Sequence, residues 1–490
     1  MDRKALAKEA LDTLELLKVT YGDVRVIHQL HEHIATKDGV VEAVESNDSL
    51  GYGVRVIKNG RWGFAASNGL SREGVYRTAR KAVELADAAA KVKGEEIELT
   101  REKRVKSTYK TPFKEDPFRV SLSEKIKLLL KADRAQRRVK GLKIAQAYYT
   151  AWKQNKLFAN TEGSWIEQQL VECGGGIEAT AVRGNDVQMR SFPNSFRGQF
   201  NTGGYEIVRN LGLVENGERI AEEAVALLSA DECPSGDYDI ILDSNQLALQ
   251  IHESCGHATE GDRALGWEAS YAGTTFLTPD KLGRFRYGSR IVNLTADATI
   301  PKGLGTFGYD DEGVAGQRIY LVKNGIFVDY QTSREVASKL TKIVKSYKRP
   351  SNGTVRADGW SRLPMIRMTN INLEPGRWRL DDLIADSKRG IFFSTNKSWS
   401  IDDKRLNFQF GTEIAWEVVN GKKTRMLKNA TYTGITPKFW GSCDAICSKD
   451  YWIVWGTPNC GKGQPSQLMH TGHGASPARF RKVKVGVIRR

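Results

Sequence analysis

The sequence predicts an α+β fold with two domains, each built on a largely antiparallel or mixed sheet with flanking helices. Helical spacing of apolar residues recurs in the first part of the chain, strand-like stretches fold back at Asn-Gly turns, and a linker-like segment lies near the middle. With 490 residues, 40% hydrophobic and 27% charged, the chain can bury the cores of two domains. We expect an N-terminal domain over residues 1–232 and a β-rich C-terminal domain over residues 233–490.

The N-terminal domain is predicted to begin with a helix over residues 3–18. Its apolar face is formed by Ala7, Ala10, Leu11, Leu14 and Leu17. Two strand-like stretches follow, residues 23–34 and 51–67, and the second folds back at Asn59-Gly60, a dipeptide typical of tight hairpin turns. These elements predict a sheet with a helix beside it.

Capping residues indicate where the next helices begin. Ser71 is placed to cap one helix, and Ser121 with Glu124 forms a capping box before another. The basic, polar stretch between these two helices is predicted to be a loop. A further helix near residues 219–228 is expected to close the domain.

The middle of the chain combines β segments with the expected domain boundary. Residues 143–200 have the pattern of short strands, which Glu162-Gly163 and the glycines at 174–176 are expected to interrupt. Residues 231–236 have the composition of a linker, and a strand at 238–242 is expected to begin the second domain. Hairpins around Asn-Gly turns are predicted beyond it, at residues 319–330 and 414–427.

The composition argues against a membrane-spanning or secreted protein. No stretch approaches the roughly 18 apolar residues that a membrane-spanning helix needs, and residues 1–4 lead into a charged amphipathic segment rather than a signal peptide. The cysteines are too sparse for a disulfide framework and suit a reducing compartment. They stand at positions 173, 233, 255, 443, 447 and 460. We therefore expect a cytoplasmic protein with no membrane partner.

The formal net charge of +16 permits a nucleic-acid partner but does not favour one. Lys and Arg are spread along the chain, and the cluster at residues 101–114 lacks the regular aromatic interleaving of a single-strand binding surface. No zinc-finger or RNA-recognition signature is found. A non-catalytic scaffold or nucleic-acid-binding protein is therefore kept only as the alternative to an enzyme.

Catalytic residue types concentrate in residues 251–262, IHESCGHATEGD. The metalloprotease pattern H-E-x-x-H separates two histidines by four positions, about 40° around a helix, with a Glu beside them. Here His252 and His257 are five positions apart, which places them about 140° apart on a regular helix, too divergent for one ion. Gly256 allows either a π-type turn or a sharp exit from the helix. We therefore predict a metal site with Glu253 beside it, where the helix loosens or ends.

The scarcity of histidine supports this prediction. The chain has only seven, and two of them stand around Glu253 in a glycine-containing turn. Another pair, His31 and His33, alternates as in a strand, but no helix-borne general base accompanies it. We expect that pair to lie on the surface.

These residues are similar to those of a known family. HESCGHATEGD matches the HExxGHxxEGD signature of the TldD/PmbA family of metallopeptidases, and further matching segments follow the family order. They are GYGVRVIKNGRWGFAASNGLS, GTFGYDDEGVAGQRIYLVKNGIF, RMTNINLEPG and PNCGKGQ. The chain resembles the TldD-type subunit rather than the TldE/PmbA type, which lacks the metal-binding histidines. The resemblance implies a zinc peptidase for unfolded or small peptides, with its sites in the cavity of a homodimer or of a heterodimer with a TldE/PmbA-like subunit.

The resemblance also implies roles for particular residues. His252, His257 and Cys460 match the family's Zn2+ ligands, and Glu253 matches its catalytic base. Three protein ligands leave a fourth zinc position for water, whose pKa falls to about 7, and a nearby carboxylate can take its proton and pass it to the leaving amine. The expected reaction is hydrolysis of an amide by activated water.

The roles of five other residues stay open at this point. Glu260 and Asp262 complete the signature and either orient the histidine rings or lie at a helix end without contact. Cys255, inside the motif, is expected to be a small filler, with competition as a ligand as the alternative. His470 and His473 can contact substrate or a second metal, although an exposed loop is the commoner setting.

Overall fold

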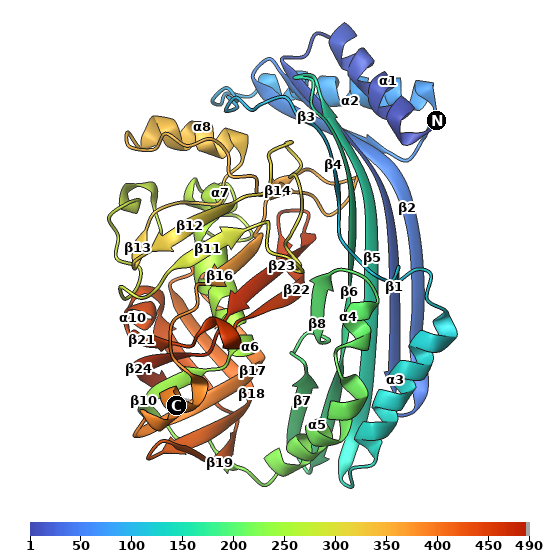
Figure 1. The fold of residues 1–490 in the computed structure, drawn as a ribbon. Coiled ribbons are helices and arrows are strands. Elements are labelled where there is room, and N and C mark those ends of the chain that lie inside the picture. The colour runs from blue at the N-terminus through green and yellow to red at the C-terminus, as the bar shows by residue number, and fades with distance from the viewer. Residues whose placement is uncertain (487–490) are drawn as a thin grey trace.

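The computed structural model describes residues 1–486 and has the mixed α+β architecture that the sequence predicts (Figure 1). The helices are α1 (Arg3–Leu16), α2 (Arg72–Ala90), α3 (Leu122–Arg137), α4 (Glu206–Arg209), α5 (Leu213–Leu227), α6 (Ser244–Ile251), α7 (Gly261–Ala264), α8 (Arg334–Ile343), α9 (Leu380–Ala385) and α10 (Thr436–Gly441), with the short turns η1 (His252–Gly256), η2 (His257–Thr259), η3 (Pro279–Lys281) and η4 (Lys449–Tyr451). The strands are β1 (Tyr21–Lys37), β2 (Val40–Lys58), β3 (Arg61–Ser67), β4 (Lys106–Lys110), β5 (Leu142–Asn160), β6 (Trp165–Arg183), β7 (Asp186–Phe192), β8 (Gln199–Thr202), β9 (Asp231–Glu232), β10 (Gly236–Leu242), β11 (Leu294–Asp297), β12 (Arg318–Lys323), β13 (Ile326–Phe327), β14 (Val355–Arg356), β15 (Met365–Ile366), β16 (Asn370–Leu373), β17 (Arg389–Ile401), β18 (Asn407–Val419), β19 (Lys422–Lys428), β20 (Thr431–Ile435), β21 (Cys443–Ile446), β22 (Ile453–Lys462), β23 (Gln467–Ala475) and β24 (Ala478–Val485). Within the described residues, no helix has both the length and the apolar character needed to cross a bilayer.

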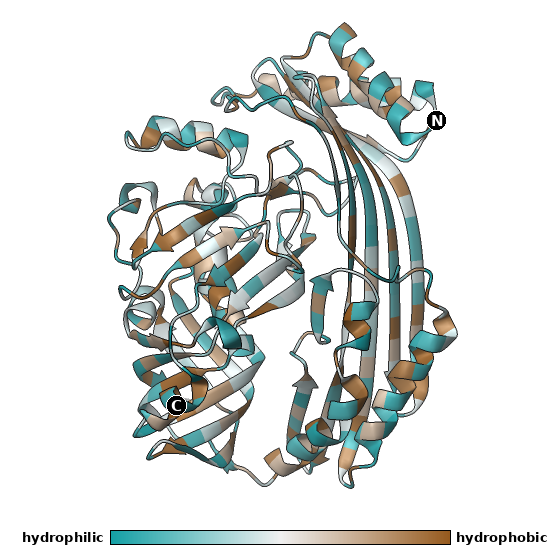
Figure 2. Ribbon diagram, in the orientation of Figure 1, coloured by the Kyte–Doolittle hydropathy of each residue, from teal (hydrophilic) through white to brown (hydrophobic). Residues whose placement is uncertain are grey.

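Very long strands form the sheet of the first half, whose order is β3-β2-β1-β5-β6-β4. Strands β1 and β5 pair antiparallel over most of their length, from Asp23 opposite Asn160 to Lys37 opposite Gln146. Helices α1 and α2 cover one end of this sheet, and α3 and α5 cover the other, each pair over its own apolar core (Figure 1). Hydrophobic and hydrophilic residues alternate along these strands (Figure 2), as expected for a sheet with two different faces.

Two further sheets build most of the second half. One has the order β17-β10-β24-β20-β18-β19-β9, and the other has the order β13-β12-β11-β16-β23-β22. Helix α6 packs against β17 of the first sheet and against β16 and β23 of the second, and all its residues are buried. The predicted hairpins at residues 319–330 and 414–427 are confirmed as β12–β13 and β18–β19.

The glycines at 174–176 do not interrupt a strand, so that prediction was wrong. Strand β6 runs through them and pairs with β5 on one side and β8 on the other. A Cβ on Gly174 would lie 2.0 Å from the carbonyl oxygen of Gln199, and one on Gly175 would lie 2.3 Å from that of Tyr148. These glycines therefore allow close approach of neighbouring backbone rather than a turn.

Two other sequence predictions concern segment boundaries. The basic stretch between α2 and α3, predicted to be a loop, also contains β4, which pairs in parallel with β6. The domain division between residues 232 and 233 stays a prediction. Residues 487–490 of the predicted second domain lie outside the described part of the chain.

Buried ion pairs join the long sheet to the second half. The carboxylate of Asp311 pairs with Lys156 of β5 and, at 3.4 Å, with Arg25 of β1. Glu312 pairs with Arg55 of β2, also at 3.4 Å. Removing one partner of a buried pair costs about 3–5 kcal/mol, because the remaining charge is left uncompensated. These pairs therefore fix the two halves against each other.

Candidate metal centre

The candidate centre begins where helix α6 changes its geometry. After Ile251 the chain makes one π-helical turn, from His252 to Gly256, and then a 3-10 turn that starts at His257. A π turn brings positions five apart to the same side of a helix. The ring centroids of His252 and His257 accordingly lie 4.9 Å apart. The predicted loosening of the helix is confirmed, in its π-type form.

Side chains from distant segments stabilise this wide turn. Tyr287 donates its hydroxyl to the carbonyl of Ser254 at 2.9 Å, and the amide of Gln331 donates to the carbonyl of Gly256 at 2.7 Å. A Cβ on Gly256 would lie 2.1 Å from the sulfur of Met368, so a larger residue there would displace that buried side chain. The turn therefore depends on tertiary packing, which satisfies carbonyls that a regular helix would pair internally.

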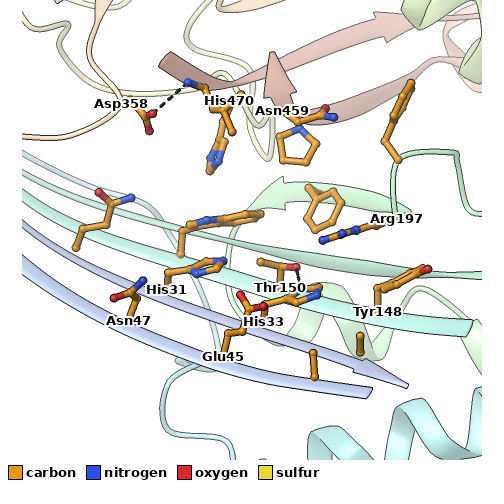
Figure 3. Close-up of a pocket in the computed structure, with 18 of the residues that line it drawn as sticks. His31, His33, Glu45, Asn47, Tyr148, Thr150, Arg197, Asp358, Asn459 and His470 are labelled. Atoms are coloured by element: carbon orange, nitrogen blue, oxygen red, sulfur yellow. Dashed lines mark hydrogen bonds between the residues drawn. The ribbon is translucent and has the colours of Figure 1, made fainter. Parts of the chain in front are cut away.

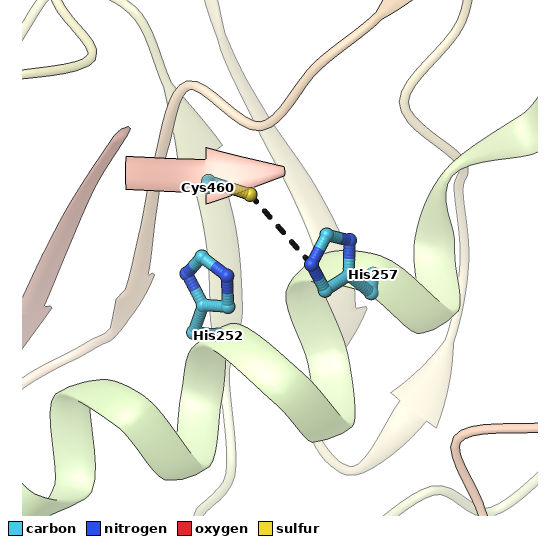
Figure 4. A group of neighbouring side chains, drawn as sticks. All are labelled: His252, His257 and Cys460. Carbon is cyan, nitrogen blue, oxygen red and sulfur yellow. Dashed lines mark hydrogen bonds between the residues drawn. The ribbon is translucent and has the colours of Figure 1, made fainter. Parts of the chain in front are cut away.

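Strand β22 brings Cys460 to the two histidines (Figure 4). The Sγ of Cys460 lies 3.6 Å from Nε2 of His257, across a separation of 203 residues. One donor atom from each of His252, His257 and Cys460 lies within 4.8 Å of the other two, and the three residues are only 3–5% exposed. Two imidazoles and a thiolate are a donor set that suits zinc. The structure thus brings together the three residues that the resemblance implied as ligands.

In both candidate ligand histidines, the ring nitrogen Nδ1 has a hydrogen-bonding partner. Nδ1 of His257 lies 2.9 Å from Oε2 of Glu260, and Nδ1 of His252 lies 2.8 Å from Nε2 of His473. The tautomer with its proton on Nδ1 donates these hydrogen bonds and leaves Nε2 free to bind a metal. Of the two alternatives for Glu260, the geometry therefore favours orientation of a histidine ring.

Lys462 connects the other signature acid to this network. Its Nζ donates to both oxygens of Asp262, at 2.8 and 2.7 Å, and lies 3.4 Å from Glu260. Burial alone would raise the pKa of Glu260, but Lys462, His257 and Arg263 outweigh it and hold that pKa well below its ordinary value. Glu260 is therefore ionised and a strong acceptor for the His257 ring.

Burial and nearby charges favour the metal-binding forms of the three candidate ligands. Burial lowers the pKa of His252 and that of His257, so both rings are neutral near pH 7. Burial would raise the pKa of the Cys460 thiol, but Arg367 and His257 outweigh it, so that pKa lies below its ordinary value. Neutral imidazoles and a thiolate are the forms that bind a metal.

Glu253 follows His252 in the π turn and forms an ion pair with Arg405. Nη1 of Arg405 donates to Oε2 of Glu253 at 2.9 Å, and both side chains are largely buried. Arg405 stands in the turn between β17 and β18, and Thr436 donates a hydrogen bond to its carbonyl at 2.9 Å. Sequence reasoning missed Arg405, because no spacing or motif connects it with residue 253. The pair fixes the direction of a carboxylate next to the candidate ligands.

From the sequence, an exposed loop was the commoner setting expected for His470 and His473. The structure does not place them in one. Both belong to β23, and three positions separate them, so His470 and His473 face opposite sides of the strand. Only His473 faces the candidate centre, where it is fully buried against His252. Cys255 is also wholly buried, in the apolar core of the second half, as expected for a small filler.

The sequence predicted that His31 and His33 lie on the surface. Instead, both face a cavity between the two halves (Figure 3). The cavity has a volume of about 1070 Å³. His33 hydrogen-bonds Thr150 at 2.8 Å, His31 stacks on Trp152, and the ring of His470 lies edge-on to Trp152, 4.4 Å between ring centres. The prediction was wrong because alternation along a strand does not reveal whether another layer covers that face. The candidate ligands do not line this cavity.

Family models match almost the whole described chain. The PmbA/TldA metallopeptidase domain 1 matches residues 22–86, the central domain matches residues 115–230, and the C-terminal domain matches residues 235–486. The chain belongs to the PmbA/TldD metallopeptidase family. The candidate centre lies entirely within the part that matches the C-terminal domain.

Relatives and solved structures agree with this assignment. The chain is 31% identical to Metalloprotease MJ0996 of Methanocaldococcus jannaschii, over 94% of this chain and 96% of the relative. It is 24% identical to the Zinc metalloprotease TldD homolog of Saccharolobus solfataricus, over 96% and 98%. The fold is that of TldE from Thermococcus kodakarensis, with a TM-score of 0.72, 16% identity and 99% coverage of both chains. The protein is therefore a metallopeptidase of the PmbA/TldD fold.

Proposed function

We propose that this metallopeptidase binds one zinc ion through His252, His257 and Cys460 and hydrolyses peptide bonds of unfolded or small peptides. The observation that carries the proposal is the convergence of two imidazoles and a thiol within 4.8 Å in a buried site. This donor set fits zinc rather than magnesium or calcium, which prefer oxygen ligands. When bound, zinc supplies an open coordination position for water and lowers the pKa of that water to about 7.

Glu253 is the proposed general base. It takes a proton from the attacking water and passes it to the nitrogen of the leaving amine, so each turnover restores its carboxylate. Arg405 holds this carboxylate in one direction. Glu260 and His473 hold the histidine rings in the same way. The buried pairs thus keep the reacting groups aligned without further rearrangement.

Burial of the centre supports flexible peptides as substrates. The candidate ligands and Glu253 are each less than a tenth exposed, and a folded domain cannot present a peptide bond at such depth. A partner subunit would enclose the site further, and we propose that the chain pairs with itself or with a TldE/PmbA-like subunit. Residues 40–50 of β2 support this, because within the described chain they pair only with β1 and expose Val40, Val41 and Val44.

We also place the protein in the cytoplasm. All six cysteines fall within the described residues, and none forms a disulfide. Unpaired thiols suit a reducing compartment.

Metal analysis together with a peptide assay tests the proposal. Wild-type protein is expected to contain one zinc per chain and to cut an unfolded peptide mixture, with the cleavage sites read by mass spectrometry. His252→Ala is expected to lose both zinc and hydrolysis, whereas the control His28→Ala, which alters a surface ring paired with Asp48, keeps both. Full hydrolysis by His252→Ala, or a wild-type protein without zinc, would contradict the proposed centre.

The substrate class has its own test. A stably folded domain and its denatured form are offered at equal concentration, and the initial rates are compared. We expect cleavage of the denatured form alone. Equal rates on both forms would exclude an enclosed site.

A further inference from the structure

A second cavity, of about 400 Å³, lies beside the candidate centre. Asp262, whose carboxylate accepts hydrogen bonds from Lys462, forms part of its wall. Gly463 and Gln464 also line it, and they directly follow β22, the strand that carries Cys460. Arg55 of β2 and Trp62 of β3, from the first half, line it as well. The cavity is therefore close to the proposed reaction site and closed by both halves of the chain.

The walls of this cavity are aromatic and aliphatic. Trp62, Trp267 and Tyr271 contribute rings, and Val355 and Met365 contribute apolar side chains. Trp267 is 43% exposed and Tyr271 is 59% exposed, so both rings can contact a bound molecule. Two cations of the chain already lie over rings of this wall, Lys339 at 5.1 Å from the centre of Trp267 and Arg55 at 4.4 Å from that of Trp62. Walls of this kind suit a long aliphatic stem, and ring faces also attract a cation.

Two carboxylates of the cavity are not paired directly with a cation of the described chain. Within residues 1–486, neither Glu268 nor Glu335 forms an ion pair, and the only side-chain hydrogen bond to either is the one that Trp62 donates to Glu335 at 2.9 Å. The other acids of the wall are compensated, Asp262 by Lys462 and Glu312 by Arg55. Burial raises the pKa of Glu268 and that of Glu335, because it outweighs the opposing charges of Lys462 and Arg263 near Glu268 and of Lys339 and Arg55 near Glu335.

We propose that this cavity binds the cationic side chain of a lysine or arginine in the peptide substrate. The aliphatic stem packs against the aromatic and aliphatic wall of the cavity, and the ammonium or guanidinium group lies against Glu268 and Glu335. The neighbouring cations Arg55 and Lys339 are paired with other acids, Arg55 with Asp23 and Glu312 and Lys339 with Glu95. The inference rests on the proposed peptidase function and adds a preference among substrates to it.

Cleavage specificity tests the proposal. Peptides that contain one lysine are expected to be cut at a fixed distance from it, and norleucine at that position is expected to lower kcat/KM by about tenfold or more, as for loss of a charged hydrogen bond. In Glu268→Gln/Glu335→Gln the lysine-to-norleucine ratio of kcat/KM is expected to fall towards one. The matched control Glu84→Gln, on the exposed face of α2, keeps the wild-type ratio. Equal kcat/KM for both peptides, or a ratio that the double variant retains, would overturn the proposal.

A binding experiment separates the cavity from the reaction. N-acetyl-lysinamide and N-acetyl-norleucinamide are titrated calorimetrically into the full chain, and we expect only the lysine compound to bind, with binding lost in the double variant. The same positive charge is also found on the α-amine at a peptide N-terminus. Norleucinamide with a free α-amine tests this source, and binding of that compound alone would refute a side-chain pocket. If lysine binds but no peptide is ever cut, the proposed function fails and the cavity stands. If peptides are cut without any preference, the function stands and the cavity proposal fails.

Discussion

Replacing Glu253 by Gln removes the proposed base and leaves its surroundings in place. The amide oxygen of Gln can still accept the hydrogen bond that Arg405 now donates at 2.9 Å. General-base catalysis by one side chain contributes about 10²–10⁴-fold, equivalent to about 2.7–5.4 kcal/mol in the barrier. We expect kcat to fall by that factor while one zinc per chain remains, because the substitution changes no candidate ligand.

The same substitution has a calculable effect on stability. Loss of one charge from a buried pair costs about 3–5 kcal/mol, and the 15% exposure of the Arg405 side chain places the expected cost near the lower end, about 3 kcal/mol. An unfolding entropy of about 2.1 cal/mol/K per residue gives about 1 kcal/mol/K for 490 residues. The midpoint of a cooperative thermal transition should therefore fall by about 3 °C.

Three measurements on one preparation test this reasoning. They are hydrolysis of a quenched fluorescent peptide, zinc content by mass spectrometry, and the thermal midpoint by calorimetry. Glu84→Gln serves as the control, because it removes an exposed carboxylate far from the centre. A Glu253→Gln protein that retains its zinc and turns over within about threefold of wild type would refute the role of this residue as base.

Further predictions address the third ligand, the metal and the contact between the two halves. Cys460→Ala is expected to lose most bound zinc and activity, whereas Cys255→Ala keeps both; equal metal content in the two variants would contradict the ligand assignment. A chelator is expected to abolish hydrolysis and to lower the thermal midpoint, because zinc binds only the folded chain; recovery with zinc but not with magnesium checks the identity of the ion. Asp311→Asn is expected to destabilise the protein by about 3–5 kcal/mol, since Lys156 and Arg25 lose their shared carboxylate; a midpoint equal to wild type at pH 7 would argue against this. Burial raises the pKa of Asp311, but Lys156 and Arg25 outweigh it and hold that pKa below its ordinary value of 3.8. This stabilisation is therefore present above about pH 4 and is lost as the pH falls further, so the midpoint of Asp311→Asn should change less between pH 6 and pH 3 than that of wild type.

Elements that depend on local spacing could be predicted from the sequence. The helix expected over residues 3–18 is α1, and the Asn-Gly turns at residues 324 and 420 are hairpins. The glycines at 174–176 were misread because their reason lies outside the segment, in the backbone of β5 and β8. A local pattern cannot distinguish a glycine needed for a turn from one needed for close packing.

The residues of the candidate site also differ in whether local sequence could predict them. His252, Glu253 and His257 were found from one short motif, and their five-residue spacing predicted the change in the helix. Cys460 came only from the family resemblance, since 203 residues separate it from His257. Arg405 was missed because its contact with the motif exists only after β17 and β18 have folded.

The long separation in sequence between the two histidines and Cys460 has a consequence during synthesis. A ribosome adding about 5–20 residues per second needs about 10–40 s to travel the 203 residues from His257 to Cys460. Throughout that interval the nascent chain carries the histidine signature without its thiolate, and β23, which supplies His473, has not yet joined β16. The donor set is complete only once nearly all of the protein has been made. The proposed peptidase centre is therefore incomplete while the chain is still being made, so it cannot cut the chain's own emerging segments.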